Sequence, residues 1–304
     1  FPDKPEVRLP RNADGRNVRF RPDTYQLEAM SGESQFGMAF DAWGHQILNS
    51  NAHHLFHEVI AARYLQRNPH LAIPDATAYM PTYGQGVEVF PVTKNPEHQL
   101  LTDVGTITSA CGVSWYQGDL FPEPFRQVTF VAEPVHNLVH ADVISDRGAT
   151  FAADRLLENS EFLASEDSWF RPVNFYVGPD GALYVIDYYR QIVEHPEWMS
   201  DEVNNSGQLY NGTDMGRIYR IVPESAPALS SSPDITLGDA ETSALVEKLA
   251  HPNLWWRRHA QRLLLDRGAT EVAAQLQEMA VSHSAAVGRV HALWTLQGLG
   301  LMDE

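Results

Sequence analysis

The stretch FRPVNFYVGPDGALYVIDYYR, residues 170–190, decides the fold. Apolar residues alternate with polar ones on both sides of Pro179-Asp-Gly181, which is typical of two short antiparallel strands joined by a tight turn. The second strand ends in Asp187, Tyr188, Tyr189 and Arg190, residue types that suit a ligand better than a core. The interpretation therefore depends on whether the same arrangement recurs elsewhere in the chain.

Two further segments repeat the arrangement. They are SQFGMAFDAWGHQILNSNAHH, residues 34–54, and SACGVSWYQGDLFPEPFRQVTFVAEPVHN, residues 109–137. Each has a polar or aromatic lead-in, a strand, an Asp-bearing turn, a second strand and a polar cluster. Three copies at irregular intervals favour an all-β propeller with about three recognisable blades and loop insertions between strands.

The repeated register predicts one shared site. Two antiparallel strands joined by a turn bring the start of the first beside the end of the second. If the blades share an axis, the three polar clusters surround one mouth of the propeller. The expected neighbours are Gln35 with Asn51, His53 and His54; Thr108 and Ser109 with Glu133, His136 and Asn137; and Arg171 with Asp187, Tyr188 and Arg190.

Every one of these residues also has a purely structural interpretation. An Asp at the end of a propeller strand often caps a turn, a pair of Tyr residues usually packs, and a His at a strand end is usually satisfied or exposed. We expect His57 and His195 to be local structural residues. The functional interpretation applies to the group of clusters rather than to any single side chain.

The rest of the chain divides into three parts. Residues 1–222 carry the strand pattern, interrupted by an expected helix from His54 to Gln66, whose apolar positions recur at helical spacing. Residues 223–239 form a linker rich in Pro and Ser. Residues 240–304 have helical periodicity, with two similar units that indicate the start of a helical solenoid.

Composition excludes several functions. The 304 residues contain 22 Lys and Arg against 39 Asp and Glu, a formal charge of -17, so we expect neither nucleic acid nor anionic lipid as a partner. The single cysteine, Cys111, allows no intrachain disulfide, and the CxxCH motif for c-type haem attachment is absent. The sequence contains no apolar run of about 18 residues, so we expect no membrane-spanning helix. The chain starts at Phe1, so we expect a processed product or part of a longer protein.

Several segments together resemble a large family of planctomycete-type proteins described as membrane-bound dehydrogenases. They are RFRPDTYQLEAMSGESQFGMAFDAWG, ACGVSWYQGDLFP, FVAEPVHNLVH, EFLASEDSWFRPVNFYVGPDGALYVIDYYRQIVEHPEW and GRIYRI. The propeller of that family is similar to the soluble glucose and sorbosone dehydrogenases, which use pyrroloquinoline quinone (PQQ), and it is followed by HEAT repeats. The resemblance covers about residues 19–222, and LAHPNLWWRRHAQRLLLDRG looks like a first HEAT repeat. The related dehydrogenases have six blades, so we expect half of the ring to lie outside this sequence.

The resemblance implies a quinoprotein dehydrogenase of a sugar, alcohol or aldehyde, periplasmic or associated with the cell envelope, with an electron-accepting cytochrome as a partner. PQQ has three carboxylates, so Arg171 and Arg190 are its candidate cations and Tyr188 a candidate stacking ring. His53, His54 or His136 is the candidate base that removes a hydroxyl proton. The candidate calcium ligands, all with side-chain oxygens, are Asn51, Glu133, Asn137 and Asp187.

Two other classes stay open. A calcium-dependent lactonase also needs a ring of carboxylate and Asn oxygens at one mouth of a propeller, and the same four residues would serve it. A propeller with a helical solenoid is also a common architecture for a non-catalytic interaction scaffold.

Overall fold

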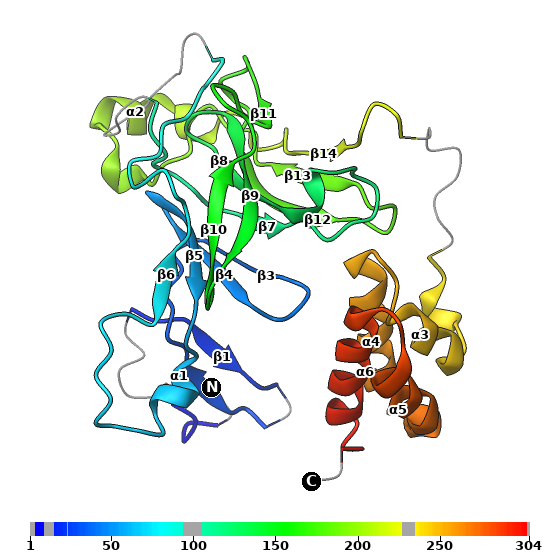
Figure 1. Ribbon diagram of the computed structural model, residues 1–304. Helices are drawn as coiled ribbons and strands as arrows, with labels where there is room; N and C mark the ends of the chain where they lie inside the picture. Colours follow the sequence, from blue (N-terminus) through cyan, green and yellow to red (C-terminus); the bar gives the residue numbers. More distant parts are fainter. Residues whose placement is uncertain (1–3, 9–14, 23, 94–104, 227–234, 303–304) are drawn as a thin grey trace.

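The computed structural model describes residues 4–8, 15–22, 24–93, 105–226 and 235–302, and its first part consists of antiparallel sheets (Figure 1). The first sheet pairs β1 (Val18–Phe20) with β2 (Leu27–Ala29). The second has the order β3 (Gly37–Phe40), β4 (Gln46–Ser50), β5 (His53–Glu58) and β6 (Thr77–Tyr79). The third has the order β7 (Val113–Trp115), β8 (Val128–Glu133), β9 (Leu138–Arg147) and β10 (Thr150–Arg155), with β11 (Leu163–Ala164) also on β9. The fourth has the order β12 (Pro172–Val177), β13 (Leu183–Asp187) and β14 (Arg217–Ile221).

Each of the three repeated segments supplies the first two strands of one sheet, as predicted. The first strands β3, β7 and β12 contact one another in that order, so the sheets converge along one edge. Glycines permit this approach. A Cβ on Gly112 would stand 2.4 Å from the carbonyl oxygen of Val173, and one on Gly37 would stand 2.7 Å from that of Cys111. The described residues before 222 are mostly β-sheet, arranged as blade-like antiparallel sheets that do not form a closed ring.

The core lies between the sheets. Strand β8 is buried along its whole length because it has a sheet on either side, and its sequence VTFVAE is accordingly apolar at most positions. One cluster joins the second and third sheets, and its fully buried members are Ile47, Leu55, Met80, Ala110, Leu138 and Ala153. Another joins the third and fourth sheets around Phe130, Leu183 and Val185.

The helix expected from His54 to Gln66 is wrong. Residues His53–Glu58 form β5, which pairs with β4 and β6, and only α1 (Ala62–Leu65) is helical. The sequence HHLFHE places buried residues on both faces of the strand, because β5 lies inside its sheet. Its apolar positions therefore imitate helical spacing without forming a helix.

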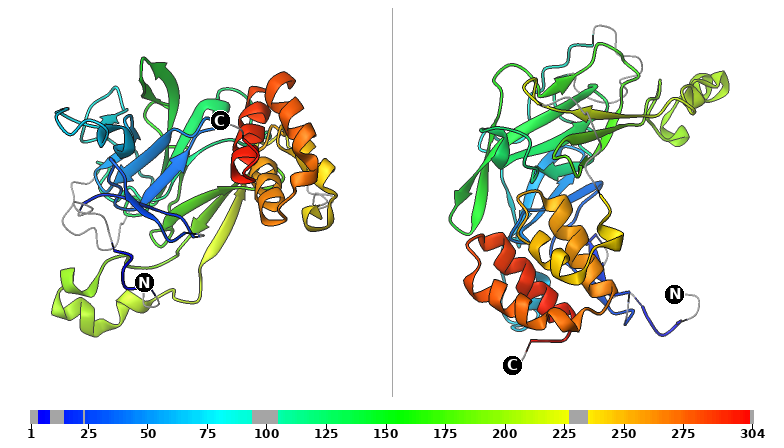
Figure 2. Two further views of the ribbon diagram at one scale, coloured as in Figure 1. Left: turned by 90° about the horizontal axis from the view of Figure 1, so that it is seen from below. Right: turned by 90° about the vertical axis from the view of Figure 1, so that its right-hand side faces the viewer.

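The chain after residue 235 is helical, as predicted. It contains α3 (Thr242–Lys248), α4 (Leu254–Asp266), α5 (Ala273–Ser282) and α6 (Ala286–Gly298), which form one group to one side of the sheets in Figure 1 and in the left view of Figure 2. The two pairs α3–α4 and α5–α6 pack around one apolar core. Whether they are HEAT repeats stays a prediction. In the described part of the chain, no helix has the length and apolar character needed to span a bilayer.

The start of α4 docks on the turn end of the sheets. Asn253 accepts a hydrogen bond from Trp255 N as the N-cap of α4, and its Nδ2 donates to the carbonyl of Gly178 at 2.9 Å. Trp256 Nε1 donates to the carbonyl of Pro179 at 2.9 Å. The predicted Pro179-Asp-Gly181 turn thus holds the helices, on the opposite end of the hairpin from Asp187.

Candidate functional site

The ends of the three hairpins lie in one continuous row. We call this row the rim; it comprises residues 51–54, 133–137 and 187–190. Backbone N of Ala110 donates to the carbonyl of Asn51 at 2.9 Å, which links the second sheet to the third. Arg171 Nη1 donates to the carbonyl of Pro134 at 2.8 Å, which links the third sheet to the fourth. The three predicted clusters therefore share one end of the sheets.

In the second sheet, Gln35 lies beside Asn51 as expected, because its Oε1 accepts a hydrogen bond from Asn51 N at 3.1 Å. Asn51 is exposed and His53 is half-buried, with its ring against Phe56 and Tyr79. His54 is fully buried and points away from the rim toward the third sheet. Of these candidates, Asn51 and His53 are open to solvent.

In the third sheet, Glu133 holds the rim together. Its Oε1 accepts from Thr108 N at 3.2 Å, from Ser109 N at 3.0 Å and from Ser109 Oγ at 2.9 Å, while its Oε2 accepts from His136 N at 2.7 Å. Burial alone would raise the pKa of Glu133, but its contacts with His136 and Ser109 hold that pKa below its ordinary value. The carboxylate is thus a buried anion whose oxygens accept hydrogen bonds from the two neighbouring loops of the same sheet.

The two other candidates in this loop are also fully buried. His136 Nε2 accepts from Gly105 N at 3.1 Å, and its Nδ1 lies 3.0 Å from Glu133 Oε2. Asn137 adopts a left-handed backbone with φ of 59°, which Asn tolerates better than most residues. Its Nδ2 donates to the carbonyl of Phe170 at 2.7 Å, so its amide joins the third sheet to the fourth.

In the fourth sheet, Asp187 Oδ1 accepts from Arg171 N and Tyr189 N, each at 2.8 Å. Its buried Oδ2 has no hydrogen-bond partner among the described residues, and burial raises the pKa of Asp187. Tyr189 has a positive φ of 46°, which turns the chain sharply after β13. Asp187 is the rim carboxylate with one oxygen still available.

Arg171, next to the rim, and Arg190, on the rim, both donate hydrogen bonds to backbone carbonyls. Arg171 is 5% exposed and donates to the carbonyls of Pro134, Arg190 and Gln191. Arg190 donates to the carbonyls of Tyr188, Tyr189 and Gly212, and its guanidinium lies 4.3 Å from the centre of the Tyr188 ring. Tyr188 itself is 48% exposed.

These contacts bear on whether the rim residues could bind PQQ and calcium, the cofactors implied by the resemblance. A PQQ carboxylate needs a cation with donors to spare, whereas Arg171 donates to main-chain oxygens through Nε and both Nη atoms, and Arg190 does so mainly through Nη1. A calcium ion needs several free oxygens at about 2.3–2.6 Å, whereas Glu133 and Asn137 already bind amides and carbonyls in separate loops. Arg171, Glu133 and Asn137 are thus engaged by the protein itself, while Asp187 keeps one free oxygen, and the assignment of PQQ and calcium to the rim residues stays a prediction.

A hollow of about 300 Å³ lies next to the rim, where the first strands converge. Its lining residues are Ser34, Gln35, Phe36, Gly37, Met38, Val113 and Asn174. None of these seven residues is charged. Phe36 is 57% exposed, and the described residues provide no hydrogen-bond partner for the amide nitrogens of Gln35 and Asn174. The volume is at the lower end of the range for small-molecule sites.

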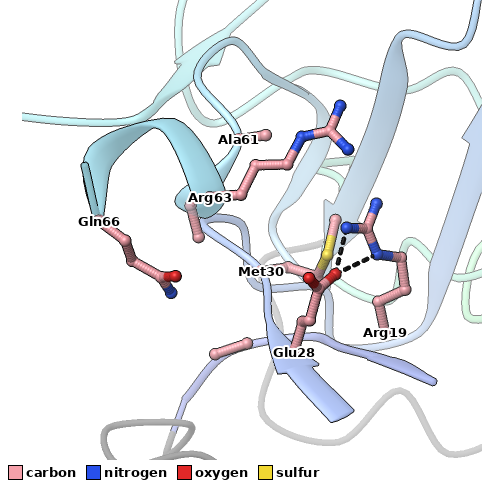
Figure 3. Close-up of a pocket in the computed structure, with 8 residues that line it drawn as sticks. Arg19, Glu28, Met30, Ala61, Arg63 and Gln66 are labelled. Atoms are coloured by element: carbon pink, nitrogen blue, oxygen red, sulfur yellow. Dashed lines mark hydrogen bonds and ion pairs between the residues drawn. The ribbon is translucent and has the colours of Figure 1, made fainter. Parts of the chain in front are cut away.

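A second, much smaller pocket lies between the first sheet and α1 (Figure 3). In Figure 3, the carboxylate of Glu28 faces the guanidinium of Arg19 from the neighbouring strand, while Arg63 and Gln66 approach from α1. The pocket has a volume of about 20 Å³, enough for about one water molecule. It is too small for an organic substrate.

A buried group of four side chains lies between the second and third sheets. We call His54, Tyr83, His140 and Asp142 the His–Asp–Tyr cluster. Tyr83 Oη lies 3.1 Å from His54 Nε2, 3.0 Å from His140 Nε2 and 2.5 Å from Asp142 Oδ1. Asp142 Oδ2 lies 2.9 Å from His54 Nε2. The two histidines and the aspartate are at most 1% exposed.

The electrostatics of the cluster depend on its neighbours. His140 Nδ1 lies 2.7 Å from Glu161 Oε2; burial lowers the pKa of His140, but Asp142 and Glu161 outweigh it and raise that pKa to about 9. Burial likewise opposes ionisation of Asp142, yet the two histidines hold its pKa well below the ordinary range. Burial lowers the pKa of His54 and, with the nearby Asp142, raises that of Tyr83 far above its ordinary value.

Only His54 of this cluster is among the residues predicted from the sequence. His140 and Asp142 stand two residues apart in the buried first half of β9, so they share one face of that strand. The alternation of His140 and Asp142 with apolar residues in LVHADV is the sequence feature that could have indicated these two cluster residues. Tyr83 lies in the connection after β6, and its position depends on how the two sheets pack, which no local pattern reports.

Comparison with known proteins gave matches to solved structures of low identity. A putative oxidoreductase (glucose dehydrogenase) from Thermus thermophilus is 15% identical over 68% of this chain and 49% of that chain, with a TM-score of 0.30. The soluble aldose sugar dehydrogenase from Escherichia coli, in its apo form, is 15% identical over 58% of this chain and 42% of that chain, with a TM-score of 0.24. The chain spans about half the length, or less, of these structures.

No curated protein matches the chain. A family model described as "Domain of unknown function (DUF7133)" matches residues 4–225, which include all four sheets. The helical part from α3 onward lies outside that match. The chain belongs to the DUF7133 family.

Proposed function

We propose that this protein takes part in the oxidation of a neutral, hydroxyl-rich substrate, a sugar in the first place, and that the substrate binds in the hollow where β3, β7 and β12 converge. The observation that carries the proposal is the lining of that hollow: an exposed aromatic ring, Phe36, beside the amide nitrogens of Gln35 and Asn174, which have no partner in the part of the chain that the structure describes. The resemblance to sugar dehydrogenases noted in the sequence supports the same substrate class.

The chemistry of the lining favours a sugar over an ionic ligand. A sugar ring presents C–H groups on its faces and hydroxyls on its edge, so an aromatic face with amide donors beside it matches both surfaces. The hollow has no charged lining residue to compensate an anion or a cation. A tricarboxylate such as PQQ would be poorly matched to the hollow itself.

PQQ is the cofactor that the resemblance implies, and the rim arginines predicted to hold it are already bound to the main chain. We therefore assign no chemical step to it on these residues. What the chain itself supplies is orientation: Gln35 is held at the rim by Asn51 N, and Asn174 by the amide of Phe175, so the two side chains face the hollow from fixed positions.

The test is a substrate screen on the purified protein with an artificial electron acceptor. Aldoses, alcohols and aldehydes are supplied with and without added PQQ and calcium, and acceptor reduction is followed optically. We expect reduction with at least one aldose and none with its sugar acid. Lactone hydrolysis that requires calcium, with no acceptor reduction, would replace the proposal by the lactonase alternative. Absence of both activities would favour the scaffold.

A further inference from the structure

The His–Asp–Tyr cluster offers four donor atoms to one point. His54 comes from β5, His140 and Asp142 from β9, and Tyr83 from the connection after β6, so three separate segments converge. Among the described residues, His54, His140 and Asp142 form the one group of three or more His, Cys, Asp or Glu side chains whose ligand atoms lie within 4.8 Å of one another. The proposed function uses none of these residues.

The separations suit a small metal ion. In a tetrahedral site with bonds of about 2.0–2.1 Å, neighbouring ligand atoms lie about 3.3 Å apart. The cluster has separations of 3.1 Å and 3.0 Å from Tyr83 Oη to the two imidazole nitrogens, and 3.5 Å from His140 Nε2 to Asp142 Oδ1. These separations lie within a few tenths of an ångström of that value, whereas Tyr83 Oη and Asp142 Oδ1, 2.5 Å apart, would have to separate by about 0.8 Å to bind one ion.

The surroundings have the features of a metal site. Glu161 Oε2 lies 2.7 Å from His140 Nδ1, the arrangement by which a carboxylate orients a metal-ligating imidazole and directs its other nitrogen at the ion. The carboxylates of Asp142 and Glu161 are at most 1% exposed, and Arg155, 3.6 Å from Glu161, is the nearby guanidinium. Two buried anions lie beside one arginine, and without an ion the proton on His140 completes their compensation, so a divalent cation would take the place of that proton.

We propose that the His–Asp–Tyr cluster is a binding site for a divalent transition-metal ion of the zinc type, with His54, His140, Asp142 and Tyr83 as ligands. Two imidazole nitrogens with two oxygens form a donor set that suits zinc and its neighbours rather than calcium, which prefers six to eight oxygens. The ion would join the second sheet to the third, since the ligands come from both. Binding of the ion would therefore stabilise the folded protein.

The first test is a zinc titration of chelator-treated, folded protein by calorimetry, repeated with cobalt as a spectroscopic probe. We expect one equivalent of Zn²⁺ per chain, a higher midpoint of thermal unfolding when it is bound, and the intense visible absorption of four-coordinate Co²⁺. Calcium at the same concentration should not compete. A folded wild-type protein that binds no stoichiometric zinc overturns the proposal.

Variants locate the ion. His140→Gln should lose the bound equivalent, whereas the matched control His57→Gln should retain it, because His57 is also buried on β5 but bonds to Thr150 outside the cluster. Stoichiometric binding retained by His140→Gln overturns the proposal. If that variant does not fold, Tyr83→Phe decides: it keeps the ring and removes one ligand, so at least tenfold weaker binding and an altered cobalt spectrum are expected. Unchanged affinity and spectrum would refute the assignment.

Discussion

Replacing Glu133 by Gln tests whether the rim carboxylate is structural. Glu133 accepts three hydrogen bonds on Oε1 and one on Oε2, all from groups of its own sheet. In Glu133→Gln one of those oxygens becomes an NH₂ group that faces a donor. Whichever way the amide turns, at least one buried N–H loses its acceptor, and the remaining bonds lose the help of the negative charge.

The magnitude follows from these contacts. A buried donor left unsatisfied costs about 1–3 kcal/mol, and hydrogen bonds to a charged group are worth about 1 kcal/mol more than those to a neutral one. We therefore expect Glu133→Gln to lower the free energy of unfolding by about 2–4 kcal/mol. The loss should be the same with and without calcium, because it arises from backbone hydrogen bonds and not from a bound ion.

Urea unfolding followed by circular dichroism measures the total effect, and amide hydrogen exchange localises it to Ser109 and His136. Glu28→Gln is the control: Glu28 pairs with Arg19 at the surface, so its loss should cost less than about 1 kcal/mol. A Glu133→Gln variant as stable as the wild type would refute the reasoning. A loss of stability seen only in the presence of calcium would instead support the predicted metal role.

Three further variants test other parts of the account. Gly112→Ala should destabilise by about 1–3 kcal/mol, because the added Cβ would meet the backbone of Val173 at 2.4 Å, whereas Gly238→Ala, with open space around it, should be close to neutral in the same thermal melts. Asn253→Ala removes both the N-cap of α4 and the hydrogen bond to Gly178, so it should lower the free energy of unfolding by about 1–3 kcal/mol and raise hydrogen exchange at the start of α4. Unchanged exchange at the start of α4 would contradict its docking on the sheets. Burial and the nearby arginines lower the pKa of His291 from 6.5 to about 4, so the folded state binds fewer protons than the unfolded state. Stability should therefore fall as the pH drops from about 6.5 to 4, and His291→Gln should weaken that dependence. A variant with an unchanged pH profile of stability would show that His291 does not cause the dependence.

Much of the fold could be predicted from the sequence because its signals are local. The hairpin of residues 170–190 appears as β12 and β13 with its turn at Pro179-Asp-Gly181, and the two other repeated segments likewise coincide with observed strand pairs. Strand β9 was missed although His140 and Asp142 alternate with apolar neighbours. Strand β5 was missed because it is buried on both faces and lacks alternation. A strand of that kind cannot be told from a buried helix by periodicity alone.

The positions of the rim residues relative to one another could be predicted from the sequence, whereas their role as a site stays a prediction. Hairpin register correctly placed Arg171 beside Asp187 and Ser109 beside Glu133. Register cannot show that these side chains are already bound to main-chain groups, because those partners come from other loops and other sheets. The roles assigned to the rim residues stay predictions. The hollow and the His–Asp–Tyr cluster needed the packing of sheets, which only the three-dimensional structure contains.

The most direct test of the central claim is the affinity of an aldose for the hollow in the wild type and in the double variant Gln35→Ala, Asn174→Ala. Each amide hydrogen bond is worth about 0.5–1.5 kcal/mol, and about 1.4 kcal/mol is a factor of ten in the dissociation constant. We expect the double variant to stay folded, with thermal unfolding lowered only by loss of the bonds from Asn51 N and Phe175 N, and to bind the aldose about 5- to 100-fold more weakly by calorimetry. An aldose that binds both proteins with the same affinity would contradict the account.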